Sequence, residues 1–321
     1  MRILITGIAG FVGANLAATL LRRGKAVAGI DDLSRGAIRN LDPVRRHANF
    51  TFEVADLSDI DAYRRALGKL HAGNPVKEVW HLAASSDIPA GVRDPGVDLR
   101  DTFMTTFNTL ALMKEFGIPV IAFASSSAVY GDLGERRLTE DAGPLLPISN
   151  YGAMKLASEA AISAAIESGL EQAFLFRFPN VVGVPATHGV IFDLVRKLAA
   201  NPEKLDVLGD GTQRKGYLHV EELVDAMLFI REHADQRLNY FNVGPDDEGA
   251  TVRFIAEEVV RQVSPAARIA YGRGDKGWPG DVPRFAYSTS KLSALGWRPK
   301  MSSGQAISMA VKQIAEQEAR H

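Results

Sequence analysis

The chain has 321 residues and contains no cysteine. This absence excludes disulfide bonds, thiolate metal sites and a cysteine nucleophile. No apolar run approaches the ~18 residues that a membrane span requires. The 37 basic and 38 acidic residues give a formal net charge of -1, so the chain has no basic surplus for nucleic acid or anionic lipid. We therefore expect neither a nucleic-acid partner nor a membrane partner.

The N-terminal residues do not predict a signal peptide. Residues Met1 to Ile5 run straight into a glycine-rich segment, whereas a signal peptide needs a longer apolar stretch and a cleavage site. On this ground we expect a cytoplasmic protein. The seven histidines show no metal-ligand spacing, so we expect no bound metal. The 46% of hydrophobic and 23% of charged residues are typical of an ordinary globular protein.

Short apolar segments alternate with helical segments over the first half of the chain. The segments that predict buried strands are residues 2–6, 26–30, 50–54, 76–82, 120–125 and 173–177. Helices are predicted at residues 14–23, 99–116 and 151–168. Alternation at this spacing is typical of parallel strands with helices on both faces. The predicted fold is therefore α/β, with a Rossmann-type, doubly wound parallel sheet.

The pattern loosens after about Asn180, where Gly and Pro become frequent and the strand signals shorten. Weak strands are predicted at residues 206–208 and 240–243, and helices at 220–232, 252–263 and 304–318. We expect a smaller C-terminal α/β lobe over residues 180–321, with the sheet in residues 1–179, although the chain is free to cross back. A ligand is expected in the cleft between the lobes.

The first motif, Gly7-Ile8-Ala9-Gly10-Phe11-Val12-Gly13, lies between the first predicted strand and the first predicted helix. Glycine permits a tight turn and lets the backbone approach a pyrophosphate. The helix start offers unpaired N–H groups and the positive end of a dipole to that anion. Glycine-rich turns are common, so it is the strand-loop-helix context that predicts a dinucleotide site.

Acidic residues follow the second and third predicted strands. Asp31, 18 residues past Gly13, can accept both adenosine ribose hydroxyls and would repel a 2′-phosphate, which favours NAD over NADP. Two alternatives stay open: Arg35 could attract that phosphate, and Asp31-Asp32 could simply open a turn. Asp56, followed by Leu57, predicts either an adenine contact or a turn or helix cap.

A third pattern combines Tyr151, Lys155 and three consecutive serines. Tyr151 and Lys155 are four residues apart, so they share one helical face. A nearby ammonium lowers a phenol's pKa from about 10 toward neutrality, which makes the phenol a usable base. Ser125 to Ser127 leave an apolar strand upstream, where they form either part of the same site or a serine-rich turn. The serines, Tyr151 and Lys155 together with the glycine loop and Asp31 predict a dinucleotide-dependent active site much more specifically than any one of these motifs alone.

These ordered motifs resemble those of the extended short-chain dehydrogenase/reductases, in the NAD-dependent epimerase/dehydratase family, and are similar to UDP-glucose 4-epimerases in particular. The segments that carry the resemblance span nearly the whole chain: residues 6–13, 31–36, 56–57, 81–84, 125–131, 151–155, 177–183, 209–213, 280–282 and 295–297. The resemblance implies an NAD-binding domain over residues 1–179 and a mainly nucleotide-sugar-binding lobe over residues 180–321. It also implies that NAD is tightly bound and regenerated in each turnover.

The resemblance assigns catalytic roles by position. Ser126 would steady the sugar oxygen, Tyr151 would be the base on a sugar hydroxyl, and Lys155 would hold the nicotinamide ribose and tune Tyr151. The residues implied in NAD binding are Gly7, Gly10, Phe11, Val12, Gly13, Asp31, Asp32, Ser34, Arg35, Asp56, Leu57, Leu82, Ala83, Ala84, Tyr151 and Lys155.

The resemblance also implies a nucleotide-sugar substrate, most plainly a UDP-sugar. In many relatives an arginine two residues before the Tyr217 position grips the diphosphate; here Lys215 stands there, beside Arg214, whose fork would fit better. The implied substrate-binding set is Asp87, Ser126, Ser127, Asn180, Val190, Ile191, Phe192, Arg214, Lys215, Asp281 and Arg284. The alternatives are a solvated surface for the basic residues, and for Asp87 a turn ahead of Pro89.

The implied reaction begins with oxidation of the sugar at C4, and the 4-keto sugar is then either re-reduced as an epimer or dehydrated. Many dehydratases carry an Asp-Glu pair where this chain has Ser127 and Ala128, which favours a 4-epimerase acting on a UDP-hexose or UDP-N-acetylhexosamine. Met154, Thr102 in place of a family Asn, and Asp87 as an added acid or base depart from the common pattern. They leave open an antibiotic-pathway activity, the 5,6-dehydration of UDP-N-acetylglucosamine in tunicamycin biosynthesis.

Two other classes are less favoured by the residues. A cofactor-sensing protein without catalysis would have lost the tyrosine, yet Ser126, Tyr151 and Lys155 are all present. An NADPH-dependent carbonyl reductase is opposed by Asp31 and by the downstream resemblance. Relatives often pair through the two helices predicted here at residues 99–116 and 151–168, so a homodimer is expected.

Overall fold

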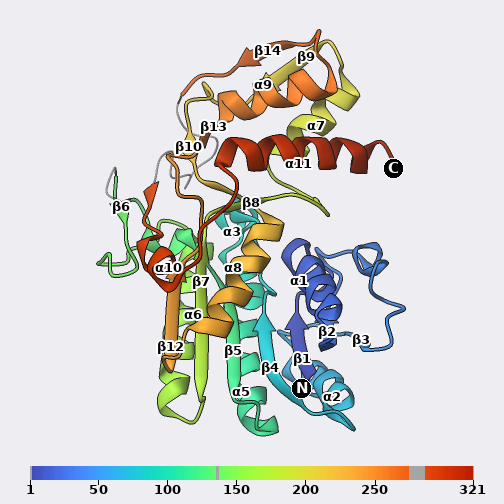
Figure 1. The fold of residues 1–321 in the computed structure, drawn as a ribbon, viewed down its shortest axis with the longest axis vertical. Helices are drawn as coiled ribbons and strands as arrows, with labels where there is room; N and C mark the ends of the chain where they lie inside the picture. Colours follow the sequence, from blue (N-terminus) through green and yellow to red (C-terminus); the bar gives the residue numbers. More distant parts are fainter. Residues whose placement is uncertain (1, 135–136, 275–285, 321) are drawn as a thin grey trace. The chain divides into compact units, whose positions relative to one another are not determined.

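The computed structural model describes residues 2–134, 137–274 and 286–320. The chain forms two compact units (Figure 1). Unit 1 comprises residues 1–131, 143–177 and 228–241, and unit 2 comprises residues 132–142, 178–227 and 242–321. The chain therefore leaves unit 1 and returns to it twice.

A seven-stranded sheet forms the centre of unit 1, in the order β12-β7-β5-β4-β1-β2-β3. Its strands are β1 (Arg2–Thr6), β2 (Ala26–Asp31), β3 (Phe50–Val54), β4 (Val76–His81), β5 (Val120–Ser126), β7 (Gln172–Phe178) and β12 (Leu238–Asn242). The pairs from β3 through β2, β1 and β4 to β5 are parallel. The predicted doubly wound parallel sheet is confirmed, and its strand order turns back between β1 and β4, where such sheets bind ligands.

The helical segments of unit 1 include the three that were predicted, with different bounds, and several that were not predicted. They are α1 (Phe11–Arg22), η1 (Ile38–Leu41), α2 (Ile60–His71), α3 (Ile88–Arg93), α4 (Pro95–Asp98), η2 (Leu99–Met104), α5 (Thr105–Phe116), η3 (Ser127–Tyr130) and α6 (Asn150–Glu167). Helix α1 begins three residues earlier than predicted, because Gly10 ends the loop directly at the helix. The single helix predicted at residues 99–116 begins with the π-helical segment η2.

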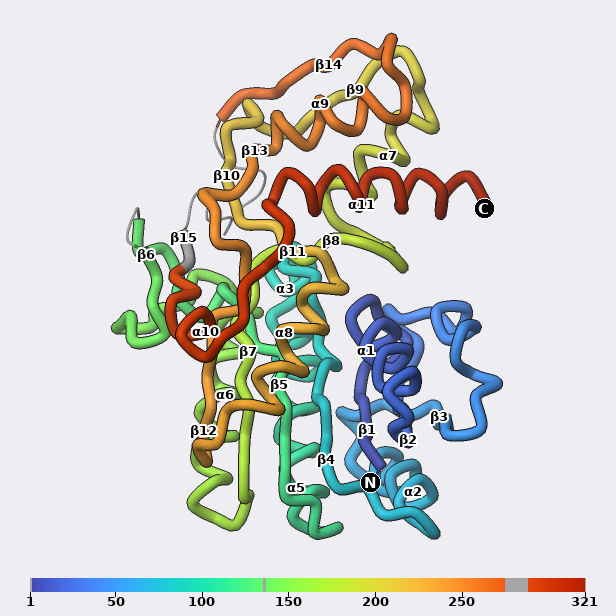
Figure 2. The backbone as a smooth tube through the Cα atoms, in the orientation of Figure 1, coloured from blue at the N-terminus to red at the C-terminus, as the bar shows by residue number. Residues whose placement is uncertain are grey.

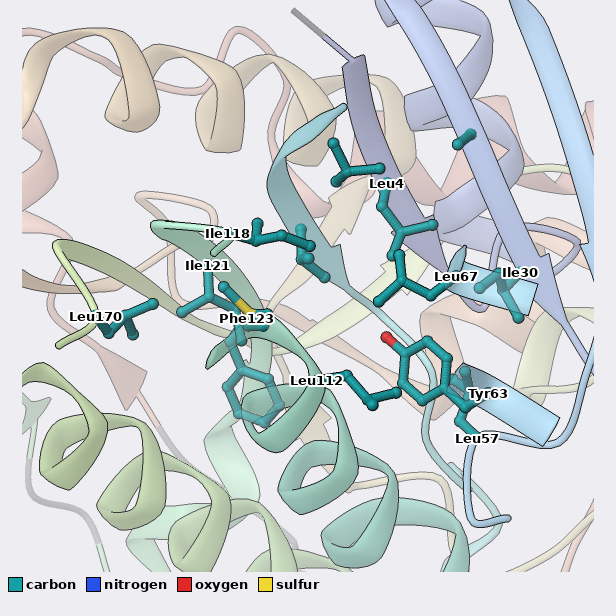
Figure 3. Packing of buried hydrophobic residues seen from close by; sticks show 14 of the residues in the cluster. Leu4, Ile30, Leu57, Tyr63, Leu67, Leu112, Ile118, Ile121, Phe123 and Leu170 are labelled. Atoms are coloured by element: carbon teal, nitrogen blue, oxygen red, sulfur yellow. The ribbon is translucent and has the colours of Figure 1, made fainter. Parts of the chain in front are cut away.

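One face of the sheet is covered by α2, α5 and α6. Figure 3 shows Leu4 and Ile30 of the sheet in the same cluster as Tyr63 and Leu67 of α2 and Leu112 of α5. The cluster also includes Ile162 and Ile166 of α6. Alternate strand residues, such as Ile3, Ile5 and Val27, are as deeply buried but point to the opposite face. Both faces are therefore covered, as a parallel sheet requires.

Unit 2 packs its helices around a second apolar cluster. Leu194 of α7 (Val190–Ala200), Ile255 of α9 (Val252–Val263) and Ile307 of α11 (Ser303–Glu318) all belong to this cluster. Short strands of this unit pair with one another: β8 (Asn180–Val182) with β11 (Tyr217–His219), β9 (Lys204–Val207) with β14 (Arg268–Tyr271), β10 (Arg214–Lys215) with β13 (Ala250–Thr251), and β6 (Arg137–Leu138) with β15 (Ala286–Tyr287). Helix α10 (Ser290–Leu295) follows β15.

The segment at residues 228–241 crosses back from unit 2 to unit 1. Helix α8 (Val220–His233) begins in unit 2 and ends in unit 1, and the tube in Figure 2 then leads into β12. The strand predicted at residues 240–243 thus lies at the edge of the large sheet, next to β7. Leu238 and Tyr240 pack against the unit 1 core, which explains this placement. In the described residues, no helix is long and apolar enough to span a bilayer.

Candidate active site

The glycine loop lies at the turning point of the sheet. Gly7, just after β1, has a left-handed backbone with φ +69° and donates its N–H to the carbonyl of Ile30 at 2.9 Å. Helix α1 starts at Phe11 with no side-chain cap and no acidic residue in its first turn. The N–H groups of that turn therefore have no intrahelical acceptor and favour an anion.

At Gly7 and Gly13 the neighbouring backbone is so close that no side chain fits. A Cβ atom on Gly13 would lie 2.3 Å from the carbonyl oxygen of Gly7, and one on Gly7 would lie 2.8 Å from the backbone of Ala83. The first close approach means that the loop packs tightly against the start of α1, and the second that it packs tightly against the residues that follow β4. Leu82 also donates its N–H to the carbonyl of Thr6 at 3.2 Å. A pyrophosphate can approach this loop because only backbone stands there.

Asp31 ends β2 as a buried carboxylate held by two backbone donors. Its Oδ2 accepts from the N–H of Ala9 and its Oδ1 from the N–H of Leu33, both at 2.9 Å. Burial raises the pKa of Asp31, and the two N–H groups oppose that shift. Each oxygen keeps a lone pair for a ribose hydroxyl. Arg35, the residue that could attract a 2′-phosphate, lies 3.4 Å from Asp87 and is already charge-compensated.

The other acidic residues predicted near the cofactor form local turns. Asp32 accepts from the N–H and the hydroxyl of Ser34 at 3.0 and 2.7 Å. Asp56 accepts in the same way from Ser58, at 2.8 Å for both bonds. Leu57 is buried in the unit 1 core. These contacts fit the turn alternative for Asp32 and Asp56, and any contact of theirs with NAD stays a prediction.

Ser126, Tyr151 and Lys155 come together in unit 1. Ser126 is the last residue of β5, and its hydroxyl hydrogen-bonds the side chain of Tyr151. Tyr151 is the second residue of α6, whose N-cap Ser149 accepts from the N–H of Gly152. Lys155, one turn later, donates to the carbonyl of Ala124 at 2.6 Å, and its Nζ lies 5.8 Å from the centroid of the Tyr151 ring. The three side chains predicted to be catalytic therefore form one cluster.

Burial shifts the two titrating groups of this cluster toward their neutral forms. It lowers the pKa of Lys155 to about 7, against the opposing charge of Glu159. It raises the pKa of Tyr151 to about 12, although the hydrogen bond with Ser126 opposes that shift. The expectation that Lys155 lowers the phenol's pKa is thus not what the protein alone shows, because desolvation of the phenolate is the larger effect.

A buried ion pair next to the cluster was not predicted from the sequence. Glu159 and Arg177 are almost fully buried, with Nη2 2.7 Å from Oε2 and Nε 2.9 Å from Oε1. The hydroxyl of Ser125 donates to Glu159, and Arg177 donates to the hydroxyl of Tyr130 at 3.1 Å. The pair joins α6 to β7 and to the end of β5. Its only sequence signal is the spacing of Glu159, four residues after Lys155 on the same helical face.

A buried chain of hydrogen-bonded polar side chains connects β1, β4, α5 and α6. His81, at the end of β4, hydrogen-bonds Thr6 at 2.7 Å and Thr106 at 3.1 Å, and Ser158 of α6 donates to Thr106 at 3.1 Å. Burial and the charge of Lys155 lower the pKa of His81 to about 3, so its ring is neutral. No group of three or more histidine or acidic side chains within the described ranges could hold a metal ion.

Asp87 and Thr102, two of the departures from the family pattern, both have local structural roles. Asp87 caps α3 by accepting the N–H of Ala90 at 3.0 Å and also pairs with Arg35. Thr102 accepts the N–H of Ser85 at 3.2 Å. These contacts fit the turn-and-cap alternative for Asp87. A role for Asp87 in the reaction stays a prediction.

The residues predicted to bind the nucleotide end lie in unit 2. Asn180 begins β8 and is exposed, whereas Ile191 is buried in the unit 2 core and Phe192 lies under the guanidinium of Arg196. Arg214 donates to the carbonyl of Gly249 at 3.3 Å, and its neighbour Lys215 is partly buried. Asp281 and Arg284 lie outside the residues that the structure describes.

Comparison with known proteins places this chain in a family. The model of the NAD dependent epimerase/dehydratase family matches residues 3–244. A putative UDP-glucose 4-epimerase of Methanocaldococcus jannaschii is 28% identical over 315 residues, which cover 96% of this chain and 97% of the relative. A crystal structure of a UDP-galactose 4-epimerase is 32% identical with a TM-score of 0.86, and 99% of each chain is covered. The Thermus thermophilus UDP-glucose 4-epimerase, in complex with NAD, is 29% identical with a TM-score of 0.84, over 98% and 99% of the two chains.

The chain belongs to the NAD-dependent epimerase/dehydratase family, among the extended short-chain dehydrogenase/reductases. It is an NAD-dependent enzyme, and the residues present fit that cofactor. The uncapped start of α1 suits the pyrophosphate, the crowded glycine backbone lets it approach, and Asp31 keeps acceptor positions for the adenosine ribose.

Replacing Gly13 by alanine should strongly reduce NAD retention. The new Cβ would meet Gly7 O at 2.3 Å and Ile8 Cα at 2.7 Å, so the loop must move away from its position above α1. We expect NAD co-purified with Gly13→Ala to fall by about tenfold or more, measured after acid release. The matched control is Gly68→Ala in α2, where the nearest atom to the new Cβ is 3.8 Å away, and NAD content should stay unchanged. Equal retention in both variants would contradict the assignment.

Replacing Glu159 by glutamine should destabilise unit 1. Arg177 would remain buried without its counter-charge, which costs about 3 kcal/mol of unfolding free energy. The control is Glu167→Gln on the same helix, since Glu167 pairs with Arg237 at 3.8 Å but both side chains are exposed. That change should cost at most about 0.5 kcal/mol. Urea denaturation measures the free energy of unfolding of both variants. Equal decreases would show that the buried pair stabilises the protein no more than the exposed pair does.

Proposed function

We propose that this enzyme is a nucleotide-sugar 4-epimerase, which inverts C4 of a UDP-hexose or a UDP-N-acetylhexosamine through a transient 4-keto sugar. The observation that carries the proposal is the cluster of Ser126, Tyr151 and Lys155 at the ends of β5 and α6. Support comes from full-length similarity to proteins described as UDP-glucose and UDP-galactose 4-epimerases.

In the proposed reaction Tyr151 handles the proton of the sugar hydroxyl. As the phenolate it accepts the O4 proton while the C4–H bond breaks with its electron pair, and it returns the proton to O4 when the carbonyl is reduced from the opposite face. When bound, NAD supplies hydride acceptance and return, and its oxidised ring brings a positive charge that favours an anionic base. Ser126 donates a hydrogen bond to O4 as it becomes a carbonyl oxygen.

Lys155 is itself held in place one helical turn after this base. Its ammonium is fixed by the carbonyl of Ala124 and lies 4.6 Å from the centroid of the Phe123 ring, so it has little freedom to move. With a pKa near 7, it is charged in part of the population at neutral pH. We propose that the remaining ammonium protons hold the nicotinamide ribose.

The nucleotide end of the substrate is proposed to bind the residues of unit 2. Asn180 and one of the two neighbouring cations, Arg214 or Lys215, would bind the diphosphate; Arg214 donates to the carbonyl of Gly249 and keeps further N–H donors. Residues 190–192 would flank the uracil base. Ile191 is buried in the core, so it would contribute through its backbone.

Epimerisation is favoured over dehydration by the groups next to Ser126. Ser127 and Ala128, which open η3, offer no carboxylic acid to move a proton at C5 or to a leaving group at C6. The carboxylate of Asp87 is held by the N–H of Ala90 and by Arg35. The 5,6-dehydration of UDP-N-acetylglucosamine is the second outcome that the following experiment distinguishes.

Incubation with UDP-glucose or UDP-N-acetylglucosamine in deuterated water, with no NAD added, should give the C4 epimer. We expect unchanged mass and no solvent deuterium on carbon, because the hydride leaves and returns at the same carbon atom. NMR and mass spectrometry read both properties. A product lighter by one water would replace epimerisation by dehydration, and no product from either sugar would contradict the proposed substrate class.

The variant Tyr151→Phe separates chemistry from binding in this experiment. It lacks the proton acceptor, so turnover should fall by at least about 100-fold while bound NAD stays unchanged. Full activity in Tyr151→Phe would refute Tyr151 as the base whatever the product.

We also propose that the chain is a homodimer that pairs through η2, α5 and α6. Leu99 and Phe107 are 49% and 51% exposed, and the rings of Phe103 and Phe107 lie 6.4 Å apart on the same helical stretch. Large apolar side chains gathered on one surface are typical of an interface.

Phe107→Glu should convert this dimer to a monomer, because it places a charge within an apolar contact. Sedimentation velocity at micromolar concentration measures the change. The control is Phe254→Glu on α9, where Phe254 is 37% exposed in unit 2, and this variant should stay dimeric. A wild-type chain that sediments as a monomer would rule out the proposal.

A further inference from the structure

Asp98 is a buried carboxylate for which the described part of the chain provides no hydrogen-bond donor. It is the last residue of α4, its exposed fraction is 0%, and neither Oδ1 nor Oδ2 has a partner there. Burying a carboxylate without donors is costly, and proteins rarely keep such a group without a use for it. Nothing in the proposed reaction uses Asp98.

The neighbouring helix is built to leave space for this carboxylate. A Cβ atom on Gly91 of α3 would lie 1.8 Å from Oδ2 of Asp98. Only glycine fits at this position, so the backbone of α3 lies directly against the carboxylate. A side chain at position 91 would therefore displace the carboxylate from its place.

Gly91 also connects Asp98 to the start of α6, which carries Tyr151. Asn150, the first residue of α6 and the neighbour of Tyr151, donates from Nδ2 to the carbonyl of Gly91 at 2.9 Å. Both α3 and α4 pack against α6. The carboxylate and the start of α6 thus contact the same residue, and the charge of Asp98 raises the pKa of Tyr151.

The charged groups that face Asp98 from its neighbours do not neutralise it. Burial raises the pKa of Asp98 to about 6, and the charges of Asp101, in η2, and Asp87, ahead of α3, add to that shift. The nearby arginines are directed to those other acids: Arg35 pairs with Asp87 at 3.4 Å and Arg100 pairs with Asp101 at 2.7 Å.

Two further features complete these surroundings. The positive charge of Arg93, on α3, attracts the carboxylate of Asp87. From α6, the group that faces Asp98 is the phenol of Tyr151. Directly after Asp98 the helix widens into the π-helical segment η2, a distortion that is frequent at functional sites.

We propose that Asp98 is a positioning residue that controls the protonation of Tyr151. When Asp98 is an anion, its charge raises the pKa of Tyr151, so the phenolate is a stronger base but a smaller part of the population. When Asp98 is protonated and neutral, this rise in the pKa of Tyr151 is lost. This inference rests on the proposed function only in taking Tyr151 as the base. The enzyme's dependence on pH would then include a carboxylic acid that never contacts the sugar.

The direct test needs no substrate. The protein is labelled with ¹³C at the ζ carbon of tyrosine, and the Tyr151 resonance is assigned by its loss in Tyr151→Phe. In the wild type this resonance should shift with a midpoint near pH 6, as Asp98 ionises. In Asp98→Asn the shift should disappear.

The matched control is Asp101→Asn, because Asp101 is 38% exposed and paired with Arg100 on the next turn. It should keep the shift of the Tyr151 resonance and move its midpoint to lower pH, since a like charge near Asp98 is removed. A wild-type Tyr151 resonance that stays flat between pH 4 and 8 would overturn the proposal, even if Asp98→Asn did not fold.

Activity provides a second measurement. Above pH 6, where Asp98 of the wild type is ionised, the phenolate should be more populated in Asp98→Asn and kcat/KM on the rising limb several-fold higher, whereas the two profiles should converge below pH 6. An unchanged profile in a folded Asp98→Asn enzyme would overturn the proposal. If the NMR shift is present but neither UDP-sugar is converted, the proposed substrate fails and the role of Asp98 stands.

Discussion

The buried pair of Glu159 and Arg177 determines where the three proposed catalytic side chains lie. Glu159 comes one turn after Lys155 on α6, and its carboxylate meets both Arg177 of β7 and the hydroxyl of Ser125 at the end of β5. A buried ion pair stabilises a fold only if its geometry is good and its remaining polar atoms are satisfied. Here both conditions can be met in one arrangement of helix and strands, so the pair fixes Tyr151 and Lys155 on α6 relative to Ser126 on β5.

Buried parallel strands were the easiest part of the fold to predict, because they form continuous apolar segments. The strand predicted at residues 120–125 ends within one residue of β5, and the helix predicted at residues 252–263 coincides with α9. The short helices α3 and α4 were not predicted, because they are too short for a periodic pattern. Their starts depend on capping by Asp87 and Asp94.

The same distinction applies to the site. The glycine loop, Asp31 and the pair Tyr151-Lys155 follow from local spacing, because a turn or a helical face brings their groups together. Asp98 has no such signal, since in the sequence it resembles its neighbours Asp94, which is exposed, and Asp101, which is half-buried. It is buried because Gly91, seven residues upstream, leaves space for it. Such a role depends on how α3 and α4 pack, which a linear pattern does not contain.

Charge at the centre of this site is suppressed by the protein itself. Burial favours a neutral phenol at Tyr151 and a neutral amine at Lys155, and His81 is neutral as well. A base in such surroundings responds strongly to any charge brought near it, because the local dielectric is low. By linkage, a cationic ligand that favours the phenolate binds more tightly to the enzyme in which the phenol has ionised.

The return of residues 228–241 to unit 1 has a consequence for how the chain is made. Strand β7 lies between β5 and β12, and β12 is synthesised about 60 residues after it. While the ribosome translates the intervening part of unit 2, one edge of β7 has no neighbour, and this strand is apolar and later fully covered over most of its length. Such an edge can pair with another nascent chain. The yield of folded enzyme should therefore depend on how quickly translation passes this interval, and on whether a chaperone covers the open edge during it.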